Sequence, residues 1–222
     1  MIESKAWKWE IVDKDDTHWN TPAGEVYYLS ENWKHKNFKT FLDMGCGFGR
    51  NSIFMAKQGF DVFGFDLSEH SVNLTIEKAK EQNVTLKAEN FVVADMINLP
   101  YADNSFDCLL ALNVISHTDT EGFKKILSEI KRVLKPNGEA YFTVGSKESF
   151  WFNNPVCIYV DENTRIRVED GPENGIPHFY IGDEDCFSMF NDFKFIEVKN
   201  VRTLTEYGTF SPHYHLWLKN DK

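Results

Sequence analysis

The stretch DMGCGFGR, from Asp43 to Arg50, stands between an apolar run and a helical pattern, and it decides the fold. It places glycine at every second position, as Gly45, Gly47 and Gly49. A glycine loop that follows a strand and opens a helix brings backbone N–H groups close to a ligand. The G-x-G-x-G spacing matches neither the dinucleotide fingerprint G-x-G-x-x-G nor the phosphate loop G-x-x-x-x-G-K-[ST]. A ligand with a pyrophosphate is therefore a poor match.

Around this loop, from 39 to 145, apolar strand-like runs alternate with helical patterns. The predicted strands are 40–42, 61–65, 91–93, 106–112 and 140–144, and the predicted helices are 51–58, 68–81 and 123–134. Ser68 is expected to cap the second helix, and Lys135-Pro136-Asn137-Gly138 to end the third. Alternation of this kind favours right-handed βαβ units in a doubly wound, mostly parallel sheet. We therefore predict an α/β fold of the Rossmann-like type.

Beyond residue 145 the alternation stops, and a β-hairpin is predicted as an insertion after the fifth strand. A loop rich in Gly and Pro follows at 171–180, and its His178, Phe179 and Tyr180 are candidates for a lid. The last two strands, joined by a turn at Tyr207-Gly208, are expected to be antiparallel because their connection is too short for a crossover. The expected elements are strands at 156–160 and 164–168, a helix at 184–190, and strands at 195–204 and 213–219.

The N-terminal segment is expected to form a helical arm packed over the edge or mouth of the sheet. Its helix is predicted to begin at Thr21-Pro22, with proline at the first helical position. Val26, Leu29 and Trp33 form its apolar stripe. We predict one domain over 1–222, divided into an arm at 1–38, a cofactor-binding core at 39–145, an insertion or lid at 146–182, and a C-terminal helix and hairpin at 183–222.

The composition excludes several classes of protein. The net charge of −10 over 222 residues disfavours nucleic-acid binding, which depends on neutralising phosphates with basic side chains. No apolar run approaches the roughly 18 residues of a membrane span, and the first residues lack the apolar core of a signal peptide. The four scattered cysteines fit free thiols in a reducing compartment. We therefore expect a cytoplasmic protein that binds neither membrane nor nucleic acid.

Three predicted strands of the sheet each end in an aspartate, at Asp43, Asp66 and Asp95. Ligands of open α/β sheets lie outside the carboxyl ends of the strands, so these side chains are expected on one rim. Asp66 is placed to accept both hydroxyls of a ribose, and Asp95 to accept from an adenine amino group. An acidic rim disfavours phosphates. It suits a cationic adenosyl ligand, for which we interpret the glycines as making room.

Five segments between 39 and 145 together resemble the class I S-adenosylmethionine-dependent methyltransferases, in the small-molecule group that includes tellurite and thiopurine enzymes. These segments are FLDMGCGFGR, VFGFDLSEHSV, VVADMINLPYADNSFD, LALNVISH and RVLKPNGEAYFTV. The resemblance implies S-adenosylmethionine as cofactor and S-adenosylhomocysteine as product. It also implies a sheet of seven strands whose last strand is antiparallel.

The same resemblance implies which residues hold the cofactor. Asn113 is implied to lie beside the methionine moiety and the methyl group. Arg50 is expected to point to solvent at a helix start, and an ion pair with the carboxylate of the cofactor is the alternative. The implied cofactor-binding residues are Asp43, Gly45, Cys46, Gly47, Asp66, Leu67, Asp95, Met96 and Asn113.

Methyl transfer from a sulfonium is an in-line displacement, for which a protein mainly supplies alignment and desolvation. The turn at 113–116, NVIS, differs from the Asn/Asp-Pro-Pro-aromatic turn of adenine-N and glutamine-N enzymes. Pro155-Val156-Cys157 does not match the Pro-Cys nucleophile of cytosine-C5 enzymes. We therefore expect a small-molecule acceptor and a monomer or homodimer. The alternatives are a regulatory or partner domain that binds the cofactor without catalysis, and a tRNA or protein methyltransferase.

Two residues are candidates for catalysis. His117 follows the fourth strand and faces the expected methyl group, which suits a general base; a polar residue leading into the next helix is the alternative. Tyr28, on the helix of the arm, is the second candidate. His213 and His215 share one strand face, but no carboxylate or cysteine at metal-ligand spacing accompanies them. We therefore predict no metal site.

Overall fold

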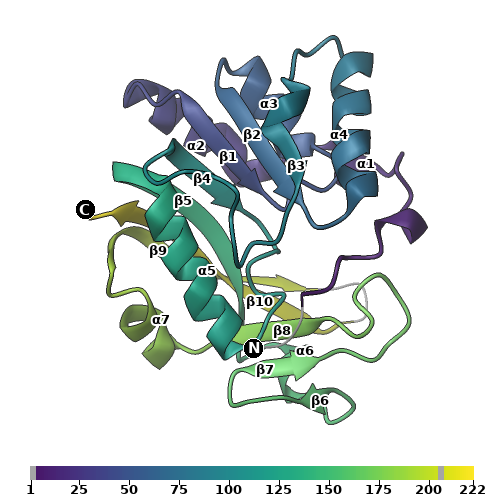
Figure 1. Ribbon diagram of the computed structural model, residues 1–222. Helices are drawn as coiled ribbons and strands as arrows, with labels where there is room; N and C mark the ends of the chain where they lie inside the picture. Colours follow the sequence, from purple (N-terminus) through teal and green to yellow (C-terminus); the bar gives the residue numbers. More distant parts are fainter. Residues whose placement is uncertain (1–3, 205–207) are drawn as a thin grey trace.

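The structure, a computed structural model, describes residues 4–204 and 208–222. Its centre is a sheet in which seven strands follow the order β3-β2-β1-β4-β5-β10-β9 (Figure 1). The first five strands are parallel, and β10 pairs antiparallel with both β5 and β9. The strand bounds are β1 Thr40–Met44, β2 Asp61–Asp66, β3 Phe91–Val93, β4 Phe106–Ala111, β5 Leu134–Ser146, β9 Phe193–Leu204 and β10 Phe210–Asn220. The predicted α/β fold, with its antiparallel last strand, is confirmed. The predicted turn at Tyr207-Gly208 lies partly outside the described residues.

Helices cover both faces of this sheet, as expected of a doubly wound fold. On one face the arm helix, α3 and α4 bury apolar side chains against strands β1, β2 and β4. On the other face α5 and α7 bury a larger cluster that includes Phe123 and Phe190. The bounds of these helices are α3 Arg50–Lys57, α4 Glu69–Glu81, α5 Thr120–Val133 and α7 Asp183–Met189. None of the helices in the described part of the chain is both long and apolar enough to cross a membrane.

The sequence signals for the start of α4 and for the end of α5 are both present in the structure. The hydroxyl of Ser68 accepts a hydrogen bond from the backbone N–H of Ser71, 3.3 Å away, and so caps α4 as predicted. Helix α5 ends at Val133, and Asn137 takes a left-handed conformation within the Lys-Pro-Asn-Gly stretch that was expected to stop it. Local side-chain chemistry therefore sets these boundaries.

The insertion contains three strands, one more than predicted. Strands β6 (Ile158–Tyr159) and β7 (Thr164–Ile166) form the predicted hairpin, although each is shorter than its apolar run. The third, β8 (Pro177–Ile181), pairs antiparallel with β7 and parallel with the end of β5. The Gly- and Pro-rich composition before it concealed this strand. A short helix, α6 (Phe150–Asn153), leads into the insertion.

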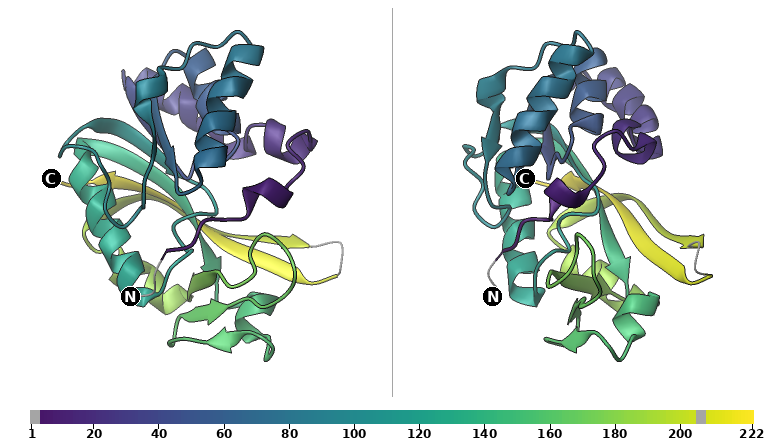
Figure 2. Two further views of the ribbon diagram at one scale, coloured as in Figure 1. Left: turned by 45° about the vertical axis from the view of Figure 1, so that its right-hand side comes forward. Right: turned by 90° about the vertical axis from the view of Figure 1, so that its right-hand side faces the viewer.

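The arm consists of a 3₁₀ turn at Trp9–Ile11, α1 at Thr17–Asn20 and α2 at Gly24–His35. Helix α2 thus begins after the predicted Thr21-Pro22, because residues 21 and 23 have extended backbones. Figure 2 shows the arm (purple) running from the insertion (green) to the end of α4. The backbone N–H of Lys8 donates to the Pro172 carbonyl, 3.3 Å away, at the insertion end of this path.

Candidate active site

A cavity of about 340 Å³ opens where the carboxyl ends of β1, β2 and β4 meet the arm and the insertion. The structure brings every residue that the sequence assigned to the cofactor to this cavity. They are Asp43, Gly45, Cys46, Gly47, Asp66, Leu67, Asp95, Met96 and Asn113. The expectation that acids at successive strand ends share one rim therefore agrees with the geometry.

The glycine loop is held close to other parts of the protein. Gly45 has a φ of +66°, and a Cβ there would lie 2.5 Å from Cγ2 of Val114. Gly47 has a φ of +54°, and a Cβ there would lie 2.9 Å from the ring of Trp9 in the arm. Both conformations favour glycine. From the sequence we interpreted the space beside these glycines as room for a ligand. In the structure, Trp9 of the arm and Val114 of the loop after β4 fill part of that space.

Asp66 fastens the glycine loop to the second strand. Its Oδ2 accepts the backbone N–H of Gly47 and its Oδ1 that of Ser68, each at 3.0 Å. Burial raises the pKa of Asp66, and these backbone hydrogen bonds oppose that rise. Each carboxylate oxygen keeps a further lone pair. The side chain can thus accept two more hydroxyl groups from a ligand in the cavity.

Asp43 is buried beneath the loop, with 3% of its surface exposed. Burial raises its pKa to about 6, while a hydrogen bond from the Ser52 hydroxyl (2.6 Å) and the charge of Arg50 oppose the rise. A cationic ligand in the cavity would favour the ionised form of this carboxyl.

The sequence led us to expect that Arg50 points to solvent, but in the structure its side chain is held by the arm. Its Nη1 donates to the carbonyl of His18 at 2.6 Å and to that of Thr21 at 3.4 Å. Its guanidinium lies 5.4 Å from the ring centre of Trp19. The first residue of α3 therefore holds the arm over the cavity. Helix starts usually expose such a residue, so only the folded arm reveals this contact.

Three tryptophans of the arm, Trp7, Trp9 and Trp19, pack edge to face with ring centres 4.5 to 5.2 Å apart. Trp9 also contacts Phe48 of the glycine loop, with ring centres 4.7 Å apart. All three tryptophans line the cavity. The aromatic N-terminus therefore forms one wall of the site.

Asn113 lies two residues after the end of β4, in a left-handed conformation with a φ of 56°. Its backbone N–H donates to the hydroxyl of Thr143 at 2.8 Å, and that hydroxyl donates to Oδ1 of Asn113 at 3.0 Å. Thr143 therefore fixes the orientation of the amide. Asp95, in the loop after β3, accepts the backbone N–H of Ile97 at 3.1 Å.

Of the two predicted catalytic residues, His117 lies at the cavity and Tyr28 does not. Burial, with His178 beside it, lowers the pKa of His117 to about 3, so its ring is neutral and only weakly basic. Tyr28 is 63% exposed on α2, with its ring centre 5.9 Å from that of Trp217. The expectation for Tyr28 is corrected: the buried stripe of α2 faces the sheet, which turns Tyr28 outward.

The insertion supplies residues that sequence reasoning did not assign to the site. Trp151, Arg167 and Glu173 line the cavity together with His178 and Tyr180, which were considered only for a lid. The nearest donor atoms of His117, Glu173 and His178 all lie within 4.8 Å of one another. They come from three separate segments, and no spacing in the sequence signals the group. No metal ligands had been expected here.

Comparison with known proteins identifies the type of domain that carries this site. Residues 42–142 match the family model described as "Methyltransferase domain". Norajmaline N-methyltransferase of Rauvolfia serpentina is 37% identical over 102 residues, which make up 46% of this chain and 34% of that protein. Demethylmenaquinone methyltransferase of Lactobacillus johnsonii is 32% identical over 136 residues, 56% of this chain and 52% of that protein.

Among solved structures, a protein of Pyrococcus horikoshii superposes with a TM-score of 0.71. The superposition covers 96% of this chain and 97% of that one at 19% identity, which is a likeness of fold. The chain spans between 30% and 65% of the length of eight curated relatives that it matches.

Proposed function

We propose that this chain, whose residues 42–142 match a methyltransferase domain, is a class I S-adenosylmethionine-dependent methyltransferase that transfers the methyl group to a small molecule. One observation carries the proposal: a single cavity joins the acidic strand ends to the aromatic and histidine wall of the arm and insertion. Cofactor residues and acceptor residues can therefore face each other without a further rearrangement of the sheet.

The acids of the rim fit the adenosyl part of that cofactor. We assign the free lone pairs of Asp66 to the ribose hydroxyls and the carboxylate of Asp95, with the backbone of Met96, to the adenine. Asp43 and Asn113 lie toward the methionine end. When bound, S-adenosylmethionine supplies an electrophilic methyl group on a positively charged sulfur. The buried Asp43 then offers a carboxylate whose charge complements that cation.

The chain's own contribution to the transfer is alignment and exclusion of water. Trp9 and Trp19 close the cofactor side, and Trp151 and Tyr180 close the side formed by the insertion. His117 is neutral and can accept a hydrogen bond from an acceptor O–H or N–H group. Its low pKa makes it a positioning group rather than a strong base near neutral pH.

Several features favour a small molecule as acceptor. The names of the two relatives above refer to methylation of norajmaline and of demethylmenaquinone, both small molecules. The net charge of −10 disfavours a nucleic acid. The four cysteines, all free, agree with a reducing compartment, and we propose a cytoplasmic monomer or homodimer that functions as one domain.

The test is a screen of acceptors with tag-free protein and S-adenosylmethionine. Thiols, amines, phenols and carboxylic acids are each supplied, and S-adenosylhomocysteine and the methylated product are detected by mass. We expect cofactor turnover that depends on one class of acceptor. Tight cofactor binding with no turnover on any small molecule, on tRNA or on protein would instead favour the regulatory alternative.

A further inference from the structure

The cluster of His117, Glu173 and His178 lies in the same cavity as the proposed cofactor site, on the wall formed by the insertion. His117 belongs to the loop after β4, Glu173 to the loop between β7 and β8, and His178 to β8. Each residue offers one donor atom within 4.8 Å of the other two. Three unrelated segments thus bring two imidazoles and one carboxylate together.

His178 is oriented as a ligand. Its Nδ1 lies 3.0 Å from the carbonyl of Ile176, so Nδ1 carries the proton and donates it in a hydrogen bond. Nε2 is then an acceptor, and it is buried with no hydrogen-bond partner, in a residue only 8% exposed. A buried acceptor without a partner destabilises the folded protein. A hydrogen bond from the second ring nitrogen to a carbonyl is also the usual support of a metal-bound histidine.

The separation of His178 from Glu173 is informative. Nε2 of His178 lies 3.7 Å from Oε2 of Glu173, which is too far for a hydrogen bond. Two ligands of one tetrahedral zinc ion, each about 2.1 Å from it, lie about 3.4 Å apart. The pair is therefore spaced for an ion between them. His117 packs edge to face on His178, with ring centres 4.9 Å apart, and its nearest donor atom lies within 4.8 Å of those of His178 and Glu173.

The surroundings of Glu173 are compatible with a cation. Arg167 forms ion pairs with both Glu173 and Glu169, so these three side chains together carry one negative charge. Arg167 also stacks over the ring of Trp151, 4.1 Å from its centre, which fixes the guanidinium. It thereby holds Glu173 in place at the cavity wall.

We infer that His117, Glu173 and His178 bind a divalent transition-metal ion, with zinc as the best match, and leave one coordination position open toward the cavity. Two imidazoles and a carboxylate form a donor set that such ions favour. Three protein ligands with an open position are typical of catalytic rather than structural zinc. Sequence analysis predicted no metal because the ligands meet only in the folded insertion.

With the ion bound, the acceptor would bind the metal in place of the hydrogen bond to His117, and this step rests on the proposed function. An acceptor that binds the ion through sulfur or oxygen is more acidic than when free. Its S–H or O–H bond breaks, the electron pair stays on the metal-bound atom, and the proton passes to water. That atom is then the nucleophile for the methyl group. The site would thus select thiol, phenol or similar acceptors.

The test is metal binding by tag-free protein, freed of metal with a chelator and kept free of S-adenosylmethionine. Zn²⁺ is titrated by calorimetry, and Co²⁺ is followed by its visible absorption. We expect one equivalent to bind, and binding at least tenfold weaker in His178→Asn and in Glu173→Gln. Glu169→Gln is the matched control, because it removes the same charge beside the same arginine. His35→Asn, on the exposed end of α2, controls for loss of a histidine.

The outcomes separate this site from the proposed function. S-adenosylmethionine affinity is measured on every variant, and its retention shows that the variant is folded. Absence of a stoichiometric ion in the wild-type protein overturns the metal site, even where cofactor binding is intact. Equal binding by the wild-type and both ligand variants also overturns it, since the ion then sits elsewhere, for example at His213 and His215. Loss of cofactor binding with metal binding intact counts against the proposed function alone.

Discussion

The backbone N–H of Gly47 donates to Oδ2 of Asp66 across 3.0 Å, so the loop after β1 is fastened to the end of β2. This contact joins the two sequence signals on which the cofactor site depends. It also means that the carboxylate that we assign to the ribose hydroxyls already holds the loop.

Replacing Asp66 by alanine is therefore expected to weaken binding of S-adenosylmethionine by about 1–3 kcal/mol. The variant loses the acceptor for the ribose hydroxyls and also releases Gly47. Calorimetric titration measures the affinity. Asp61→Ala, at the opposite end of β2, is the matched control and should bind normally. Unchanged affinity in Asp66→Ala would remove the ribose assignment.

The raised pKa of Asp43 predicts how cofactor affinity depends on pH. This pKa is about 6 in the free protein, and a bound cation lowers it, so binding releases a proton near pH 6. Affinity should then fall as the pH drops from 7 to 5. Calorimetry in two buffers with different ionisation enthalpies detects the proton. Asp43→Asn should bind more weakly at pH 7 and lose most of this pH dependence, even though Asp66 remains.

The same raised pKa affects the stability of the ligand-free protein. A group whose pKa is higher in the folded than in the unfolded state stabilises the fold at low pH, and this contribution is lost as the pH rises through the folded value. For Asp43 this stabilising contribution is lost as the pH rises from about 4 to about 6. Urea unfolding at pH 7.5 should find Asp43→Asn more stable than the wild-type protein, on the order of 2 kcal/mol. Lower stability of the variant would contradict this account of the buried carboxyl.

The contacts of Arg50 predict how stably the arm docks on the rest of the protein. Arg50→Ala removes two hydrogen bonds to arm carbonyls and the contact with Trp19, at an expected cost of about 1–2 kcal/mol to arm docking. Amide hydrogen exchange over 4–20 should accelerate, while the sheet stays protected. Arg202→Ala, which removes an exposed ion pair with Glu148 and a contact with the ring of Phe210, should leave the arm unchanged. An equally protected arm in both variants would contradict the role of Arg50.

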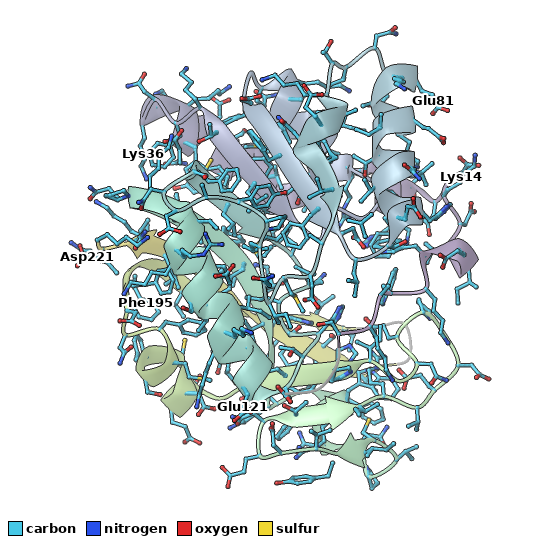
Figure 3. All side chains as sticks on the ribbon, viewed as in Figure 1. Lys14, Lys36, Glu81, Glu121, Phe195 and Asp221 are labelled. Carbon is cyan, nitrogen blue, oxygen red and sulfur yellow. The ribbon has the colours of Figure 1, made fainter. Side chains whose placement is uncertain are left out.

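Glu139, on strand β5 in the interior of the sheet, does not line the cavity and joins the sheet to the arm helix. Its Oε2 accepts the indole N–H groups of Trp33 and Trp217, each at 3.0 Å, and its Oε1 pairs with Lys36 at 2.7 Å. Lys36 is labelled in Figure 3, where it lies near the end of α2. The carboxylate is 3% exposed, so it ties the arm helix to β5 and β10 inside the core.

Glu139→Ala leaves both indole N–H groups buried without a partner. We expect the free energy of unfolding to fall by about 2–4 kcal/mol, measured by urea denaturation. Glu148→Ala is the control, because its ion pair with Arg202 is exposed, and its effect should stay within about 0.5 kcal/mol. Cofactor affinity should be the same in the two variants, since neither residue lines the cavity.

Much of the fold and one half of the site could be predicted from the sequence because their signals are local. Apolar periodicity placed helix α5, and Ser68 marked the start of α4. Parallel strands end on one edge, so the sequence alone predicts that Asp43, Asp66 and Asp95 lie together. The third strand of the insertion was missed because glycines and prolines surround the short run at 177–181.

The other half of the site depends on contacts between distant segments. Tyr28 and His117 were both proposed from position along the chain, but helix rotation turned Tyr28 outward and burial made His117 a weak base. Arg50 was expected in solvent, yet the arm returns over it. Nothing in the spacing of residues 117, 173 and 178 indicates that their side chains meet.

The sequence by itself determined the doubly wound sheet, the glycine loop and the acidic rim, because strand alternation and strand ends follow from hydrophobic period and topology. Only the tertiary structure decided what encloses that rim. The arm and the insertion reach the cavity through long-range packing, for which neighbouring residues carry no signal. Where the arm and the insertion meet, tryptophans lie over the glycine loop, and two histidines and a glutamate lie in the same cavity.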